Sequence, residues 1–162
     1  MMKNAEQYVI DPRKVESNED PRQFLMIRNI PNSISQEELL SILETYVQGE
    51  IEFLYLPIDK VTSCNLGYGY VSLLNCSSVL KLYNAMHKKR WPKSSSLKLC
   101  DIVYARIQGH RDYVKMCDRW EIMNESPALQ PIFFKKVEKE KNGVKQVLMV
   151  RSSFKELRKR HP

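Results

Sequence analysis

The chain has 162 residues, of which 43% are hydrophobic and 28% charged, and its net charge is +7. This composition is typical of a soluble globular protein, and the length predicts one domain with extensions around a single core. No apolar run approaches membrane-spanning length, and the N-terminus lacks the apolar stretch of a signal peptide. We therefore expect a soluble intracellular protein with no membrane partner.

The positive charge is concentrated near the C-terminus. Residues 135–162 hold ten of the 26 Lys and Arg residues but only three of the 19 Asp and Glu residues. This segment therefore accounts for the whole net charge, and residues 1–134 are neutral overall. A neutral body with a basic tail indicates a polyanionic partner, or else a solvated tail that serves solubility alone.

The sequence shows no pattern typical of a metal site or a catalytic site. The four cysteines and three histidines are scattered, with no pair at metal-ligand spacing, so the thiols are interpreted as reduced side chains. The sequence also lacks a phosphate-binding glycine loop and paired catalytic carboxylates. We expect no cofactor, no metal and no enzymatic activity.

In chain order, residues 1–22 are polar and predict a mostly disordered leader. An apolar run over 24–27 predicts a first strand, which stops at Pro31 and Asn32. Ser35 and Glu38 then fit a capping box, and apolar residues at helical spacing predict a helix up to Gly49. Residues 51–56 predict a second strand, because they are apolar and are followed by Pro57.

A third strand is predicted around the sequence GYGYVSL, in which Gly67 and Gly69 alternate with two tyrosines. Ser77 and Ser78 are expected to start a second helix, which ends in the basic run 87–90, and residues 97–107 predict a fourth strand. The order β-α-β-β-α-β over residues 23–108 indicates an α+β, ferredoxin-like fold. Such a fold has a four-stranded antiparallel sheet with two helices on one face.

An extension follows this domain. Residues 109–134 are expected to form a C-terminal helix and an extended segment that pack on the domain, at its edge or across the sheet. Residues 135–162 predict a basic tail with a β-hairpin, since Asn142 and Gly143 separate two apolar runs. The basic end at 154–160 is either a frayed tail or a patch for nuclear targeting or RNA contact.

Two tyrosines, Tyr68 and Tyr70, would lie on one face of the third strand, while Gly67 and Gly69 on the other face let it approach the helices closely. In this fold the first and third strands are central, so the open face is centred on the tyrosines, Met26 and Arg28. Aromatic rings on a rigid strand can stack on nucleic-acid bases of any identity. The face therefore predicts a binding surface for single-stranded nucleic acid.

The stretch LGYGYVSL (66–73) matches the octamer K/R-G-F/Y-G/A-F-V-x-F/Y of the RNA recognition motif at five successive positions, if Tyr is allowed for the second Phe. More closely, residues 24–134 resemble the RNA recognition motif of the Mei-two-like family, meiotic and developmental RNA-binding proteins of fungi and plants. The stretches that carry this resemblance are LMIRNIPN (25–32), FLYLPID (53–59), CNLGYGYV (64–71), KRW (89–91), YARIQG (104–109) and PIFF (131–134). Met26 and Leu66, which depart from the general motif, are similar to the residues that this family has there.

By analogy with the motif, Tyr70 would stack on a base and Tyr68 would lie against the sugars. Arg28 would donate to a phosphate or a base edge, and the basic loop before Trp91 would meet phosphates, with Trp91 itself structural. Asp101 would also point outward, to accept from a base amino group or to repel phosphate. The predicted RNA-binding residues are Met26, Arg28, Tyr55, Tyr68, Tyr70, Lys88, Lys89, Arg90, Val103 and Ala105.

We therefore expect a single-stranded RNA-binding protein. The resemblance implies a post-transcriptional regulator linked to meiosis, located in the nucleus, the cytoplasm or both, and we expect it to be monomeric. The alternative is a protein–protein interaction module on the same fold, with a protein partner bound through the acidic first helix or the C-terminal extension.

Overall fold

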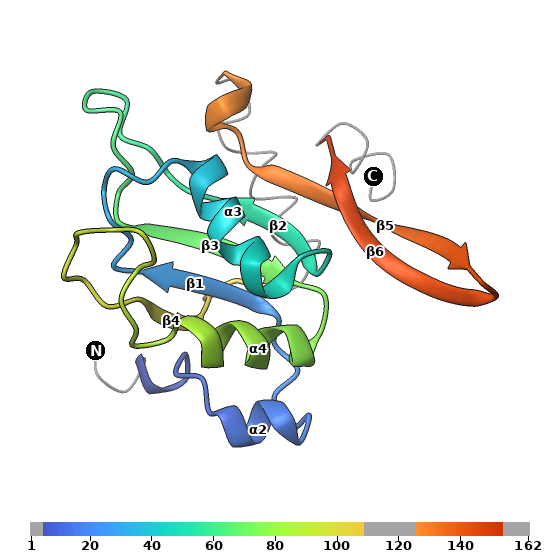
Figure 1. Ribbon diagram of the computed structural model, residues 1–162. Coiled ribbons are helices and arrows are strands. Elements are labelled where there is room, and N and C mark those ends of the chain that lie inside the picture. Colours follow the sequence, from blue (N-terminus) through green and yellow to red (C-terminus); the bar gives the residue numbers. More distant parts are fainter. Residues whose placement is uncertain (1–4, 109–125, 154–162) are drawn as a thin grey trace.

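A six-stranded antiparallel sheet organises the chain, with strand order β4-β1-β3-β2-β5-β6. The computed structural model describes residues 5–108 and 126–153, and Figure 1 shows helices α3 and α4 on one face of the sheet. The elements are α2 (Pro12–Glu16), β1 (Phe24–Arg28), α3 (Gln36–Val47), β2 (Ile51–Tyr55), β3 (Tyr68–Leu73), α4 (Cys76–Met86), β4 (Asp101–Tyr104), the 3-10 helix η2 (Pro127–Leu129), β5 (Ile132–Lys141) and β6 (Val144–Ser152).

The predicted β-α-β-β-α-β core is present, but the expectation of a four-stranded sheet is wrong. Strand β5 joins the outer edge of β2, where Phe133 lies opposite Phe53 and Ile132 lies opposite Leu54. The rings of Phe53 and Phe133 lie 5.3 Å apart and are fully buried, so the added strand covers apolar surface as well as free backbone groups. The predicted hairpin at Asn142 and Gly143 then brings β6 beside β5.

Helix α3 begins and packs as the sequence predicts. The Ser35 hydroxyl accepts a hydrogen bond from the Glu38 backbone N–H at 3.1 Å, which satisfies one of the free donors of the first turn. Leu39, Leu43 and Val47 recur on one face of the helix and are completely buried. The periodic apolar pattern thus fixes which side of α3 faces the sheet.

Two predicted boundaries need correction. Helix α4 is capped by Asn75 rather than started by Ser77 and Ser78, because the Asn75 side-chain oxygen accepts from the Ser78 backbone N–H at 2.9 Å. Strand β4 covers only Asp101–Tyr104 of the expected 97–107. Its ladder runs along β1 from Leu25 opposite Tyr104 to Arg28 opposite Asp101, and one more backbone bond, from Ala105 to the Phe24 carbonyl at 2.9 Å, follows it.

The two glycines beside the tyrosines do different things. Gly69 is buried in β3, and a Cβ atom there would lie 3.1 Å from the backbone oxygen of Tyr55, so close approach of neighbouring strands requires glycine. Gly67 precedes the strand and has a φ of +91°, with open space where a Cβ atom would lie. This position requires glycine for its backbone conformation, because residues with a side chain rarely adopt such a φ angle.

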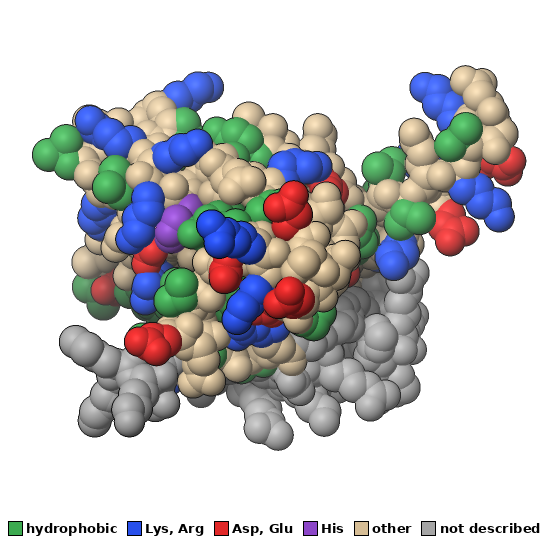
Figure 2. All heavy atoms as spheres, turned by 90° about the horizontal axis from the view of Figure 1, so that it is seen from below, with side chains coloured by type: hydrophobic (Ala, Val, Ile, Leu, Met, Phe, Trp, Pro, Cys, Tyr) green, Lys and Arg blue, Asp and Glu red, His purple; other side chains and the backbone are tan. Residues whose placement is uncertain are grey.

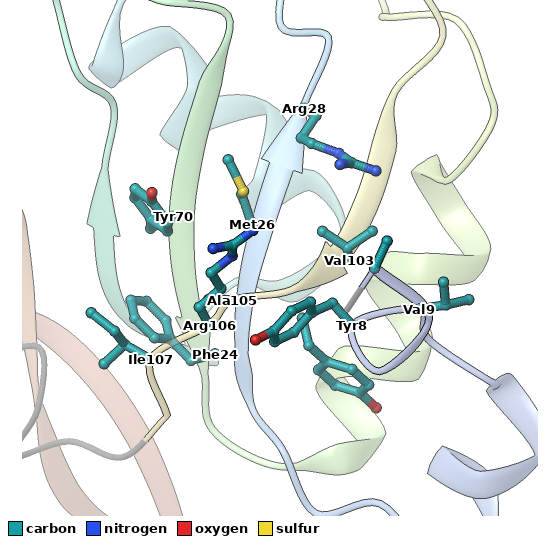
Figure 3. Close-up of a pocket in the computed structure, with 12 residues that line it drawn as sticks. Tyr8, Val9, Phe24, Met26, Arg28, Tyr70, Val103, Ala105, Arg106 and Ile107 are labelled. Atoms are coloured by element: carbon teal, nitrogen blue, oxygen red, sulfur yellow. The ribbon is translucent and has the colours of Figure 1, made fainter. Parts of the chain in front are cut away.

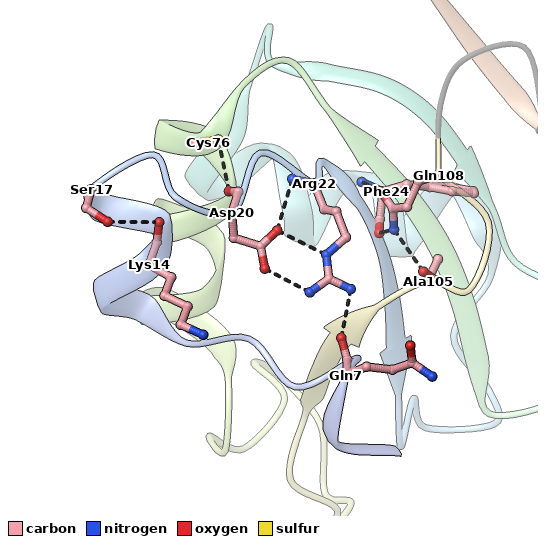
Figure 4. A network of polar contacts seen from close by, with 9 residues as sticks. All are labelled: Gln7, Lys14, Ser17, Asp20, Arg22, Phe24, Cys76, Ala105 and Gln108. Carbon is pink, nitrogen blue, oxygen red and sulfur yellow. Dashed lines mark hydrogen bonds and ion pairs between the residues drawn. The ribbon is translucent and has the colours of Figure 1, made fainter. Parts of the chain in front are cut away.

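Residues 5–22 are folded, contrary to the expectation of a disordered leader. Ile10 and Val15 are only 3% and 2% exposed, because α2 and its preceding segment pack on α4 and join the core. The Tyr104 backbone N–H donates to the Tyr8 carbonyl at 2.8 Å, which ties this segment to the free edge of β4. Arg22 adds a hydrogen bond to the Gln7 carbonyl at 2.7 Å and an ion pair with Asp20 at 2.8 Å (Figure 4).

The predicted C-terminal helix falls largely outside the described residues, which resume at Ser126 with η2 and β5. The hairpin of β5 and β6 is attached to the α3 side of the domain near its base. There Arg151 pairs with Glu37 at 2.5 Å, and the Met149 backbone N–H donates to the Gly49 carbonyl at 3.0 Å. Figure 2 shows the rest of the hairpin projecting from the body, with basic and acidic side chains along it.

Within the described ranges, every helix is too short or too polar to cross a membrane.

Candidate nucleic-acid interface

The sheet face opposite α3 and α4 is built from rows of side chains that run across the strands. Residues directly opposite one another on antiparallel strands share a face and lie close together. We name three rows: the ion-pair row is Asp101, Arg28 and Tyr68; the tyrosine row is Val103, Met26, Tyr70 and Tyr55; the phenylalanine row is Phe24, Ser72, Phe53 and Phe133.

The two predicted stacking residues lie together on the central strand β3. The rings of Tyr68 and Tyr70 are 5.9 Å apart and almost perpendicular, at 82°, and both residues are half-buried. Burial and the neighbouring Tyr68 raise the pKa of Tyr70, while Arg106 opposes the shift. The Tyr70 phenol therefore stays neutral near pH 7, so that its ring can stack and its hydroxyl can donate.

The phenylalanine row is closed to solvent. Phe24, Phe53 and Phe133 are 2%, 0% and 1% exposed, although they lie on the face without α3 and α4. Tyr55 shares the tyrosine row but is only 8% exposed, so the expectation that it extends the platform does not fit this structure. The accessible surface lies instead over β1, β3 and β4, at Met26, Val103 and the two tyrosines.

Arg28, the predicted phosphate donor, is already paired. Its Nε lies 2.8 Å from Oδ2 of Asp101, and its Nη2 also donates to that oxygen. Lys88 adds a second cation, with Nζ 3.3 Å from Oδ1 of the same carboxylate. Burial raises the pKa of Asp101, but the hydrogen bonds and charges of Arg28 and Lys88 outweigh it and hold that pKa below its usual value. Asp101 is therefore ionised at neutral pH and restrains both cations.

The other two predicted basic residues point away from the sheet face. Lys89 donates to the Asn84 carbonyl of α4 at 2.8 Å, and Arg90 donates to the Ser96 carbonyl in the following loop at 3.1 Å. Of the three, only Lys88 contacts the ion-pair row, through Asp101. Trp91 is 3% exposed, in agreement with the structural role predicted for it.

A pocket that the sequence analysis missed lies at the outer edge of β4. It has a volume of about 540 Å³, and we call it the β4-edge pocket, lined by Tyr8, Phe24, Met26, Tyr70, Val103, Ala105 and Arg106 among others. Figure 3 shows Tyr8 and Val9 beside Val103, with Arg106 next to Met26. The sequence does not predict that Tyr8 lines this pocket, because residues 1–22 carry no strong helical or strand pattern.

No metal or thiol site accompanies this face in residues 5–108 and 126–153. They contain no group of three or more His, Cys, Asp or Glu side chains that could hold a metal ion. Burial raises the pKa of the Cys100 thiol to about 12, so this cysteine stays protonated. Burial also lowers the pKa of His87, whose Nδ1 accepts from the Ile102 backbone N–H at 3.0 Å.

Comparison with known families identifies the family to which this chain belongs. Residues 22–118 match the family model described as RNA recognition motif 2. The chain belongs to the RNA recognition motif family, in the form found in MEI2-like proteins. It is 37% identical over 133 residues to Protein MEI2-like 5 of Arabidopsis thaliana, a match that covers 82% of this chain and 17% of that protein.

A second relative gives a similar picture. Over 131 residues the chain is 35% identical to Protein MEI2-like 2 of Oryza sativa subsp. japonica, covering 81% of this chain and 15% of the relative. The chain thus spans less than a fifth of the length of the relatives it matches. Membership of the family supports RNA binding by this chain.

Solved structures with a similar fold are distant in sequence. The Rna15 RRM with bound RNA (GU) is 13% identical with a TM-score of 0.48, and the match covers 62% of this chain and 100% of that one. The two RNA recognition domains of Sex-lethal from Drosophila melanogaster are also 13% identical, with a TM-score of 0.44, and the match covers 85% and 90% of the two chains.

Proposed function

We propose that this chain binds single-stranded RNA on the part of its sheet face over β1, β3 and β4. The observation that carries the proposal is the pair Tyr68 and Tyr70, two accessible rings 5.9 Å apart on the central strand of a rigid sheet. A base stacked on an aromatic side chain is stabilised by about 1–3 kcal/mol whatever its identity. Met26, opposite Tyr70 on β1, adds an apolar contact beside the rings.

Stacking on two rings alone would give weak binding. Two bases contribute about 2–6 kcal/mol together, and a millimolar dissociation constant already needs about 4 kcal/mol. Tighter binding therefore requires cations. Arg28 and Lys88 are restrained by Asp101, so we propose that Arg106, Lys139 and Lys141 supply the cations that reach the RNA.

The biological setting follows from the relatives and is part of the proposal. The MEI2-like names support a post-transcriptional regulator with a role in meiosis or development, acting in the nucleus, the cytoplasm or both. Because the matched region is a small part of those proteins, the contribution of this chain is inferred to be RNA recognition by a single module.

The alternative of a protein-binding module is less well supported. The acidic surface of α3 was its basis, but Glu37 on that surface pairs with Arg151 of β6 in the same chain. The Arg151 hydrogen bonds also outweigh burial and lower the pKa of Glu37. Part of this helix surface therefore has a partner within the chain, whereas the two tyrosines remain accessible.

The direct test is a pair of double variants at the tyrosines. Replacing Tyr68 and Tyr70 with Leu removes both stacking surfaces and should weaken binding of a single-stranded RNA at least tenfold. Replacing both with Phe keeps the rings and should retain most of the affinity. Circular dichroism confirms that both variants fold. If the folded leucine variant bound RNA like the wild-type protein, the sheet face would not be the binding surface.

A further inference from the structure

The β4-edge pocket has the size and shape of a ligand site. Its volume of about 540 Å³ lies within the range of about 300–1,000 Å³ that is usual for small-molecule sites. One side is the accessible sheet surface at Met26, Tyr70 and Val103, and the opposite side is the Tyr8 segment. A flat ligand on the sheet would thus be covered from a second direction.

Both sides of the pocket are held in place before any ligand arrives. The Tyr8 carbonyl accepts from Tyr104 of β4, and the guanidinium of Arg22 lies 3.9 Å from the centre of the Tyr104 ring. On the other side, Gln108 bonds the backbone of Phe24 at 2.9 and 3.2 Å and the Ala105 carbonyl at 2.8 Å. Figure 4 shows the Gln108 contacts, and Arg22 held by Asp20 and the Gln7 carbonyl. Such preorganisation lowers the entropic cost of binding.

Arg106 is the available cation of this pocket. It is exposed, and the described residues give it no carboxylate partner, in contrast to Arg28 in the ion-pair row. Its guanidinium carbon lies 5.7 Å from the centre of the Tyr8 ring, within cation–π range. Arg106 therefore lies between the two sides of the pocket, where its guanidinium N–H groups can donate to a ligand.

The charged groups that line the pocket, the guanidinium groups of Arg28 and Arg106, are hydrogen-bond donors. Among its described lining residues there is no carboxylate, amide or imidazole side chain, and guanidinium groups donate only. Guanine offers two acceptors, O6 and N7, on one edge, and uracil offers O4. Cytosine presents an amino donor there and adenine a mixed edge, for which Arg106 is a poorer partner.

We propose that the β4-edge pocket takes one base of the bound RNA, with its plane between Tyr8 and the sheet and a base carbonyl on Arg106. The site then selects guanine, and next uracil, over adenine and cytosine. This inference rests on the proposed RNA binding and adds to it a residue that determines base specificity.

The test uses four RNA heptamers, AAAXAAA with X as A, C, G or U, and fluorescence anisotropy with the full chain. The wild-type protein should bind the G heptamer about tenfold more tightly than the A and C heptamers, a difference of about 1.4 kcal/mol. Arg106→Ala should abolish this preference, and Arg106→Lys should restore only part of it, because lysine donates to the same acceptors but lacks the planar fork. Tyr8→Leu should weaken binding of the G heptamer, and Tyr8→Phe should not.

Arg13→Ala is the matched control, since it removes one exposed arginine from α2, on the helix side of the fold. It should leave the base preference unchanged. Equal affinities of the wild-type protein for all four heptamers would overturn the specificity proposal while leaving the stacking function intact. If Arg106→Ala lost the same affinity for all four heptamers, Arg106 would contact phosphate, and the specificity proposal would again be wrong. If none of the heptamers bound, both the pocket and the proposed RNA binding would be wrong.

Discussion

Arg28 and Asp101 lie opposite each other on β1 and β4 and form an ion pair on the sheet face, with Nε 2.8 Å from Oδ2. Asp101 is 13% exposed at its side chain and Arg28 is 48% exposed, so one acid at the strand edge restrains a cation that reaches solvent. Lys88 contacts the same carboxylate. One carboxylate thus holds two cations, and a phosphate would have to compete with Asp101 for both of them.

Removing this restraint should strengthen RNA binding. In Asp101→Asn, Arg28 and Lys88 become available to phosphates, and each new contact should steepen the log–log salt dependence by about 0.7. We expect a change in slope of up to about 1.4 and severalfold tighter binding at low salt. Asp20→Asn is the control, because it removes a carboxylate paired with Arg22 in the N-terminal segment. An unchanged slope in Asp101→Asn would show that neither cation reaches the RNA.

The same acid gives a pH-dependent contribution to stability. Because the pKa of Asp101 is lowered in the folded state, its ionised form stabilises the fold above the unfolded pKa near 3.9. That stabilisation, about 1 kcal/mol for a partly exposed pair, should be lost as the pH falls through the folded pKa. The difference in free energy of unfolding between wild type and Asp101→Asn, measured in urea, should be full at pH 6 and shrink below pH 4. If the difference in unfolding free energy instead grew as the pH fell, the ionised form of Asp101 would not be the one that stabilises the fold.

The folded N-terminal segment leads to a clear stability prediction. Val15 is 2% exposed within the core, whereas Val61 is 93% exposed in a loop. Val15→Ala removes the same atoms as Val61→Ala but leaves a buried gap, so it should cost about 2 kcal/mol of unfolding free energy. Val61→Ala should change it by less than about 0.5 kcal/mol. Equal urea midpoints for the two variants would mean that α2 is not part of the cooperative fold.

The features that the sequence predicted well depend on short-range patterns. The cap at Ser35, the apolar repeat of α3, the Asn142-Gly143 turn and the alternation around Tyr68 and Tyr70 each involve residues only a few positions apart. Local geometry alone decides them.

The missed features depend on contacts between distant parts of the chain. The pairing of Phe53 with Phe133 makes a six-stranded sheet, and the packing of Val15 on α4 orders a five-residue helix that would be unstable alone. The restraint of Arg28 by Asp101 follows from strand register, and the position of Arg106 beside Tyr8 depends on the packing of the N-terminal segment. None of these relationships leaves a periodic signal.

The charge of the β5–β6 hairpin is divided between its two faces. Lys139 and Lys141 lie on the same side of β5 as Val137 and Phe133, the side that continues the proposed RNA-binding face of the sheet. Both acidic residues of the hairpin, Glu138 and Glu140, lie on the opposite side. The sequence analysis placed the available charge in residues 135–162, and this arrangement directs part of it toward the proposed RNA surface.

We therefore predict that the hairpin contacts phosphates through Lys139 and Lys141. Deleting residues 135–162 would be a poor test, because it also removes Met149, which is 9% exposed in the core, and the Arg151–Glu37 pair. Lys139→Gln with Lys141→Gln should instead reduce the salt slope by up to about 1.4 and weaken binding, because two phosphate contacts are lost. Base preference should survive, since phosphate contacts position the RNA and base contacts specify it.

The matched control for this hairpin variant is Lys136→Gln with Lys145→Gln. It removes the same charge from the side of the hairpin that carries the two glutamates, where Lys145 lies directly opposite Glu140. If the RNA contacts only the side with Lys139 and Lys141, the control should change the salt slope of RNA binding much less. A general effect of net charge would change the slope equally in both variants. Equal slopes for the wild-type protein and the Lys139/Lys141 variant, in a salt titration on one oligonucleotide, would mean that the hairpin serves something other than RNA.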